Sequence, residues 1–250
     1  MTEVLLNHFY VTPDRTTFEA ASLILPELGA LEKRTTVRKD MTYTGLYLYG
    51  QRTYLELLHP DSAGAFGAPS GIAWGVEEPG AIGGVFPGGP TDEVSRGQTP
   101  WFRRAAPAQP LQGLTEWAME YLPDFFRGFH PELPPTTPGI ARADALTRYA
   151  ASCGKLRDRE QGLFEDVISH EVSLAAGDLE RWNARALRIR DVDVRVRAAR
   201  AGDPSGIVAA RLRLRRDAGK VTKRIGSTTL SLDGRGAVWR FQESLHGELP

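Results

Sequence analysis

The chain has 250 residues and a mass of 27.5 kDa, the size of one large domain or two small ones. Its single cysteine, Cys153, excludes a disulfide framework and any zinc or iron–sulfur site built from several cysteines. No apolar run approaches the roughly 20 residues of a membrane-spanning helix, and the N-terminal residues lack the pattern of a signal peptide. We therefore expect a soluble, cytoplasmic protein without a membrane partner.

The formal net charge is zero, which argues against nucleic acid as a partner. The charge is uneven, however, because residues 181–224 carry 14 Lys and Arg against 4 Asp. Within this stretch, two segments of residues 191–216 alternate Arg with aliphatic residues and predict a basic hairpin. Asp191 and Asp193 share its charged face, and no aromatic residue is available to stack on bases. We interpret the hairpin as a solvated or self-paired sheet face.

The first 60 residues predict the element order β-α-β-β-β. A strand over residues 4–11 precedes a helix that is capped by Thr12 or Asp14 and ended by Gly29. Apolar residues recur through this helix at helical spacing. Three segments of strand-like residues follow, and the last two predict a hairpin with its turn at Gly50. Residues 71–126 predict a second, looser unit of the same order.

The proline-rich stretch 129–139 predicts a linker, because clustered prolines are excluded from helix interiors and central strands. Residues 140–163 predict a helix that frays at Gly154. A strand over residues 166–174, a helix capped by Asp178, the basic hairpin and two closing strands complete the chain. The predicted organisation is a two-module domain at 1–128, the linker, and a helix-led unit at 140–250 that is a candidate for a further, degenerate module.

The segments LNHFYV, MTYTGLYLYG, YLELLHP and SGIAWGVEEPG resemble the vicinal oxygen chelate superfamily, in particular its glyoxalase-like and bleomycin-resistance-like members. The resemblance covers residues 4–126. It implies an α+β fold in which paired βαβββ modules form a cup-shaped sheet around a ligand, with the C-terminal helix-led α/β unit added. In such modules a His on the first strand and a Glu on the fourth bind a divalent metal. His8 and Glu56 occupy these places.

Alternation along the strands predicts which side chains line the cup. Leu6, His8 and Tyr10 share one face of the first strand, and Tyr54 shares a face of the fourth strand with Glu56. Tyr47 and Tyr49 share a face of the third strand. A cup lined by these four tyrosines suits a flat or partly aromatic ligand.

The second module departs from the family pattern, because Trp74 stands where its first-strand His is expected and an indole cannot bind a metal. Glu116 or Glu120 on its last strand remains as a carboxylate, and His170 of the third unit offers a second imidazole. The predicted metal ligands are His8 and Glu56, with Glu120 or His170 completing the set. Such ligands suit iron, manganese, nickel or zinc. Glu56 and Glu120 are the predicted catalytic residues.

The resemblance implies an enzyme that acts on a small organic molecule through a divalent metal, by isomerisation, lysis or ring-cleaving dioxygenation. The alternative is a metal-free small-molecule-binding or resistance-type protein on the same scaffold, in which Trp74 stacks on the ligand. A third hypothesis is an interaction protein that uses the basic hairpin. The chain has no phosphate-binding loop or dinucleotide fingerprint, so we expect no nucleotide cofactor. Modules of this kind often complete their cup across a dimer, which leaves a homodimer open.

Overall fold

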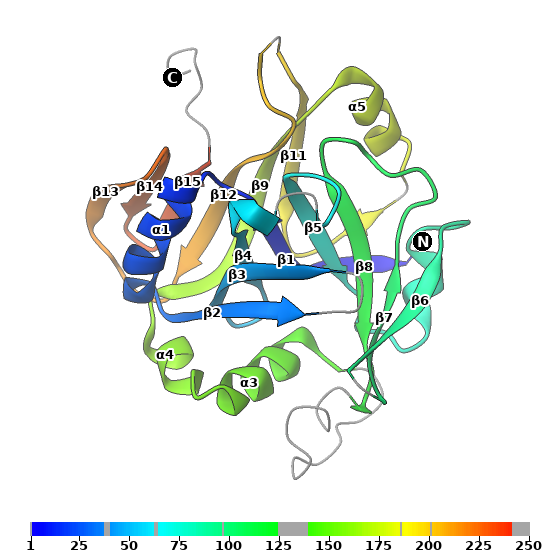
Figure 1. The fold of residues 1–250 in the computed structure, drawn as a ribbon, viewed down its shortest axis with the longest axis horizontal. Helices are drawn as coiled ribbons and strands as arrows, with labels where there is room; N and C mark the ends of the chain where they lie inside the picture. The colour runs from blue at the N-terminus through cyan, green and yellow to red at the C-terminus, as the bar shows by residue number, and fades with distance from the viewer. Residues whose placement is uncertain are drawn as a thin grey trace.

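The computed structural model describes residues 2–37, 41–62, 65–96, 98–124, 140–185, 187–200 and 202–241. This part of the chain is a mixed α and β structure in which strands predominate and form two sheets (Figure 1). The first sheet curls into a half-barrel, in agreement with the expected cup. Among the described residues, no helix has both the length and the apolar character needed to cross a membrane.

The first sheet has two halves with the same strand order. Its strands are β1 (Glu3–Val11), β2 (Ala30–Val37), β3 (Thr42–Tyr49), β4 (Tyr54–Leu58), β5 (Ser70–Gly75), β6 (Thr91–Arg96), β7 (Thr99–Ala105) and β8 (Thr115–Tyr121). They are arranged β2-β3-β4-β1-β5-β8-β7-β6, and the short β10 (Arg188–Ile189) pairs with β1. β1 is parallel to β4, and β5 is parallel to β8. β1 and β5 meet antiparallel at the centre.

The two halves differ in the connection after their first strand. In the first half α1 (Arg15–Ile24) begins at Asp14, whose carboxylate accepts the backbone N–H of Thr17 at 2.8 Å. The helix continues into a 3-10 turn, η1 (Leu25–Glu27). In the second half the connection from β5 to β6 contains only the 3-10 turn η3 (Ala81–Gly84), so the helix expected there is absent from this described stretch. A further 3-10 turn, η2 (Pro60–Ser62), follows β4.

Over the residues that the structure describes, the second sheet does not contain the expected basic hairpin. Its strands are β9 (Phe164–Leu174), β11 (Asp193–Ala198), β12 (Gly206–Leu214), β13 (Lys220–Ile225), β14 (Thr228–Asp233) and β15 (Gly236–Arg240). Their order is β11-β9-β12-β15-β14-β13. β9 lies between β11 and β12, so these two strands do not pair, and the connection between them crosses the end of β9. β13 was not expected from the sequence.

The C-terminal helices also differ from expectation. The single helix expected at 140–163 is divided into α3 (Arg142–Ser152) and α4 (Leu156–Gln161) by Gly154, whose φ of +69° is incompatible with a continuous helix. α5 (Ala176–Asn183) begins after Ala175, so Asp178 lies in its first turn and does not cap it. The carboxylate of Asp178 instead accepts the backbone N–H groups of Gln112 and Gly113.

One hydrophobic core joins the two sheets. It contains Phe9, Leu55 and Trp74 of the first sheet together with Phe164 and Trp239 of the second, and α1 packs into the same core. We call the side of the first sheet that carries these residues the core face and the opposite, concave side the cup face. The linker predicted at 129–139 lies outside the described residues. On the cup face, α3 packs against the sheet. In Figure 1 it lies below β2.

A buried aspartate of the second sheet fixes a turn of the first. Asp166 on β9 accepts the backbone N–H groups of Arg52 and Thr53 at 2.8 and 3.0 Å, as well as the Thr53 hydroxyl at 3.1 Å. The Arg52 side chain adds an ion pair at 3.1 Å. The turn between β3 and β4 is therefore held by hydrogen bonds to a charged acceptor that is 2% exposed.

We predict that Asp166→Ala lowers the free energy of unfolding by about 3 kcal/mol, because it leaves buried backbone donors without an acceptor. Urea unfolding followed by circular dichroism measures this change. The control, Asp193→Ala, removes an exposed aspartate of β11 and should change stability by less than about 0.5 kcal/mol. Equal effects of the two substitutions would contradict the prediction.

Candidate functional site: a tyrosine-lined cup

The strand register places the predicted cup residues in two adjacent rows. One row, read across the sheet, contains Tyr49, Tyr54, His8, Ala73 and Trp117. The next row contains Tyr47, Glu56, Tyr10, Gly71 and Thr115. The structure therefore brings His8, Glu56 and the four predicted tyrosines together on the cup face. Leu6, which was expected beside His8, lies on the core face because β1 has a bulge between these two residues.

All seven tyrosines of the chain gather at this cup. Six come from the first sheet and one from α3, and they are Tyr10, Tyr43, Tyr47, Tyr49, Tyr54, Tyr121 and Tyr149. Burial raises the pKa of Tyr10, Tyr47 and Tyr54, and the negative charge of Glu56 adds to this effect. Their hydroxyl groups consequently remain protonated at neutral pH and can donate hydrogen bonds.

His8 is held as a neutral imidazole within the rings of the cup. It stacks on Tyr54 with ring centroids 4.2 Å apart, and Trp117 meets it edge-on at 5.3 Å. Its Nδ1 lies 2.8 Å from the amide oxygen of Asn7, whose amide nitrogen donates to Tyr121. Nδ1 therefore carries the proton, and Nε2 is an acceptor. Burial lowers the pKa of His8 to about 3.

A polar network closes one rim of the cup. Glu32 on β2 accepts hydrogen bonds from Tyr49 at 2.5 Å and from Tyr149 at 3.0 Å. The guanidinium of Arg34 lies 4.2 Å from the ring centroid of Tyr47 and donates to the Tyr149 hydroxyl. Glu32, Arg34 and Tyr149 are not among the site residues predicted from the sequence. Alternation along β2 is a signal for the first two, because Glu32 pairs directly with Tyr47, whereas nothing in the sequence points to Tyr149.

Helix α3 covers the cup. Ala145 and Leu146 pack against the cup face, as does the preceding Ile140. Arg142 anchors the start of the helix, because it donates to the carbonyl oxygen of Leu6 and pairs with Asp191 at 2.8 Å. The cup is therefore a buried site beneath a helix.

Three predicted site residues lie on the other side of the first sheet. Trp74 is fully buried on the core face, where its indole N–H donates to Glu116 at 3.3 Å. Glu120 also lies away from the cup, and it accepts the backbone N–H groups of Gly80 and Ile82. Side chains alternate between the two faces along β8. Trp117, Met119 and Tyr121 therefore face the cup, whereas Glu116 and Glu120 face away from it.

His170 lies between the two sheets. Its ring centroid is 4.6 Å from that of Phe9, and neither ring nitrogen has a hydrogen-bond partner among the residues that the structure describes. Neither Glu120 nor His170 therefore joins His8 and Glu56, and the predicted metal set does not assemble. Within the described ranges, no group of three His, Cys, Asp or Glu side chains is placed to hold a metal ion.

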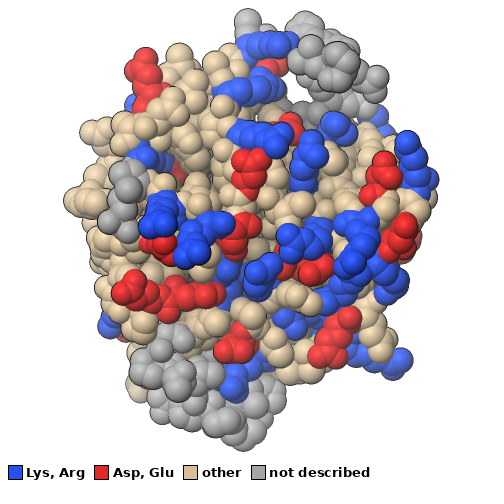
Figure 2. All heavy atoms as spheres, turned by 180° about the vertical axis from the view of Figure 1, so that it is seen from behind, with Lys and Arg blue, Asp and Glu red and all other residues tan. Residues whose placement is uncertain are grey.

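Arg195 and Arg197 of β11 and Arg211 of β12 are exposed on one face of the second sheet, as expected, but β9 lies between the two strands. Asp191, which was expected on this face, instead accepts the backbone N–H of Leu6 and pairs with Arg142. On β11, Arg195 pairs with Asp193. The view from behind shows Lys and Arg side chains gathered over the middle and right of the surface, with acidic side chains beside them (Figure 2).

The two buried histidines predict a loss of stability in mild acid. Burial lowers the pKa of His8 and His170 to about 3, whereas an unfolded histidine titrates near 6.5. The unfolded chain thus binds more protons, and stability falls as the pH drops from 6.5 toward 3. We predict a loss of about 2 kcal/mol per histidine between pH 7 and pH 5.

Urea unfolding at the two pH values measures this loss, and His170→Leu should reduce it by about 2 kcal/mol. An unchanged difference between pH 7 and pH 5 in this variant would show that His170 does not titrate as the structure indicates.

The comparison with known proteins places this architecture in a family. No curated protein matches the chain. Residues 6–241 match a family of unknown function, DUF5829, and this range includes every cup residue and both sheets except the first three residues of β1. The chain therefore belongs to the DUF5829 family of proteins of unknown function.

Proposed function

We propose that the chain is a small-molecule-binding protein that holds a flat or partly aromatic ligand in the tyrosine-lined cup. The observation that carries this proposal is the gathering of all seven tyrosines around His8 and Glu56. Tyrosines supply large aromatic faces together with protonated hydroxyl groups, while Glu56 and Nε2 of His8 supply acceptors. This combination suits a ring that carries polar substituents.

The scaffold that we propose is of the vicinal oxygen chelate type. The order β2-β3-β4-β1 with β1 parallel to β4 fits one βαβββ module, and β5-β8-β7-β6 with β5 parallel to β8 fits a second module. The second module would have lost its helix to the short η3 turn. The antiparallel contact of β1 with β5 would then join the modules into one cup.

A metal-dependent enzyme is less well supported, because its donor set is divided by the sheet. His8 and Glu56 lie on the cup face, but Glu120 already accepts two backbone N–H groups on the core face and His170 is buried in the core. The residues present do not fit the predicted metal site, and we derive no metal-dependent reaction from them.

In this proposal α3 is a movable cover. Tyr149 connects it to the rim through Glu32 and Arg34, and Arg142 anchors its first turn. Ile140 and Leu146 occupy space above the tyrosines that a ligand would take. Ligand binding would therefore displace α3 and expose these rim contacts.

We predict that ligand-observed NMR with a library of mono- and bicyclic phenols and aromatic carboxamides identifies binders of the cup. Tyr54→Leu removes the ring that stacks on His8 and should weaken the binders at least about tenfold. Glu56→Gln should weaken those that donate a hydrogen bond to the carboxylate.

The matched control is Glu171→Gln, which changes a half-buried carboxylate of β9 in the second sheet and should leave affinity unchanged. Two results would contradict the proposal. One is a set of binders indifferent to Tyr54→Leu. The other is stoichiometric iron, manganese, nickel or zinc in the purified protein that disappears in Glu56→Ala, because this result would restore the metal-dependent enzyme.

A further inference from the structure

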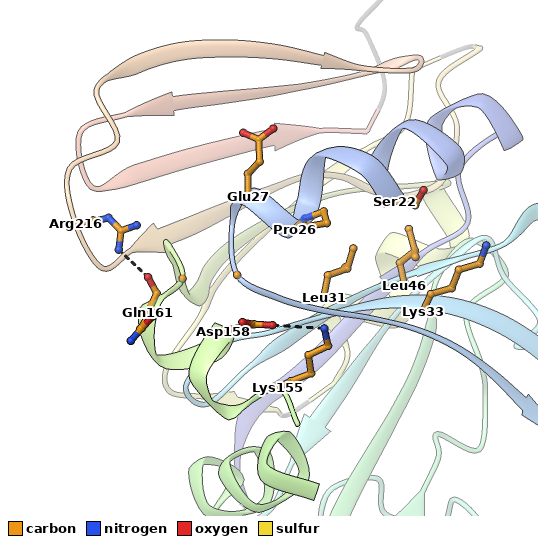
Figure 3. Close-up of a pocket in the computed structure, with 12 residues that line it drawn as sticks. Ser22, Pro26, Glu27, Leu31, Lys33, Leu46, Lys155, Asp158, Gln161 and Arg216 are labelled. Carbon is orange, nitrogen blue, oxygen red and sulfur yellow. Dashed lines mark hydrogen bonds and ion pairs between the residues drawn. The ribbon is translucent and has the colours of Figure 1, made fainter. Parts of the chain in front are cut away.

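A surface cleft of about 640 Å³ lies outside the cup, at the edge of the core face (Figure 3). One wall is the end of α1 with η1, the other is α4, and β2 and β3 form the floor. Leu31 and Leu46 point from these strands toward α1, and Pro26 lies above them. The middle of the cleft is therefore apolar.

Backbone contact fixes the closed end of this cleft. A Cβ atom on Gly162 would lie 2.5 Å from Cα of Gly29 and 2.8 Å from the carbonyl oxygen of Leu28, so this position requires glycine. The same carbonyl accepts the backbone N–H of Phe164 at 2.8 Å. The separation of the two walls therefore does not depend on any flexible side chain.

Two of the cations that line the cleft have no acidic partner among the described residues. Its acidic residues already have partners, because Glu27 pairs with Lys223 and Asp158 pairs with Lys155 at 3.5 Å. Arg216 donates to the backbone carbonyl of Gln161 at 2.8 Å. Within the part of the chain that the structure describes, neither Arg216 nor Lys33 has an acidic partner. The cleft therefore favours an anion.

Lys33 stands where the apolar cleft meets a second hollow of about 430 Å³, and it lines both. The second hollow is lined by the hydroxyl groups of Thr35, Thr42, Thr44 and Ser62 and also by His59 and Asp61. The carboxylate of Asp61 pairs with Arg15 at 2.7 Å. The hydroxyls of Thr35 and Thr44 are hydrogen-bonded to each other at 2.8 Å. An ammonium group beside hydroxyl donors is suited to a carboxylate or phosphate.

We propose that this cleft binds an amphipathic anion, with an aliphatic or aryl chain over Leu31, Leu46 and Pro26 and a carboxylate or phosphate ester at Lys33. Burial of the chain against these residues supplies the apolar part of the binding free energy. The head group receives the charge of Lys33 and one hydrogen bond from the Thr35–Thr44 pair, donated by the hydroxyl that does not donate to the other. The site is separate from the cup and does not depend on its function.

Four probes with the same chain test this assignment: octanoate, octyl phosphate, 1-octanol and octylammonium. Titration into protein with labelled leucine methyl groups should shift the Leu31 and Leu46 resonances with the two anions, and their relative affinities identify the preferred head group. Lys33→Gln should weaken the anions at least about tenfold and leave octanol unchanged. Leu31→Ser should weaken all probes that bind.

Two control variants separate this site from other surfaces. Arg104→Gln removes an exposed cation on β7, and Glu56→Gln changes the cup; both should retain the wild-type affinity for the anions. Octylammonium that binds as tightly as octanoate, shifts confined to cup residues, or anion affinity unchanged in Lys33→Gln would each overturn the proposal. A failure of the cup to bind aromatic ligands would not alter any of these measurements.

Discussion

The whole structure depends on the burial of both faces of one curled sheet. The core face packs against the second sheet and α1, while the cup face lies beneath α3. Each central strand must therefore carry buried side chains in both phases of its alternation. On β3 and β4, Leu46, Leu48, Leu55 and Leu57 lie on the core face. The cup face carries the tyrosines, Glu56 and Leu58. On these two strands, only the cup face thus concentrates groups that can recognise a polar ligand.

Buried charged residues connect elements that are distant in sequence. Asp166 holds the turn between β3 and β4, Asp178 holds backbone N–H groups before β8, and Asp191 meets Arg142 and the backbone of β1. Each carboxylate accepts several hydrogen bonds, which offsets the cost of removing a charge from water. These interactions fix positions at which hydrophobic packing alone would permit sliding. They fix the turn between β3 and β4, the segment before β8 and the first turn of α3.

Local patterns in the sequence predict one half of the site well. Period-two alternation identifies the cup phase of β3 and β4, and with it Tyr47, Tyr54 and Glu56. It fails for Trp74 and Glu120 because alternation defines two faces of a strand without saying which one meets the cup. That choice depends on how β5 and β8 pair with their neighbours.

Other features depend on contacts across the fold. The bulge that separates Leu6 from His8 arises in the pairing of β1 with β5, and the residues of β1 do not predict it. The turn at residues 202–206 is typical of a hairpin, yet β9 inserts between the two strands that it connects. Tyr149 reaches the site only because α3 folds back over the sheet. Non-local pairing decides each of these outcomes, and a short sequence window contains no information about it.

The pairing of β1 with β10 has a consequence for synthesis of the protein. β1 occupies the centre of the first sheet, yet its end pairs with residues 188–189 and its backbone is held by Asp191. Strands β1 to β8, which form nearly the whole first sheet, are therefore synthesised before residues 188–191, which pair with β1 at the centre of that sheet. Until then, the core face has no second sheet to cover its leucines. The nascent N-terminal half consequently exposes an apolar surface until the second sheet has been synthesised.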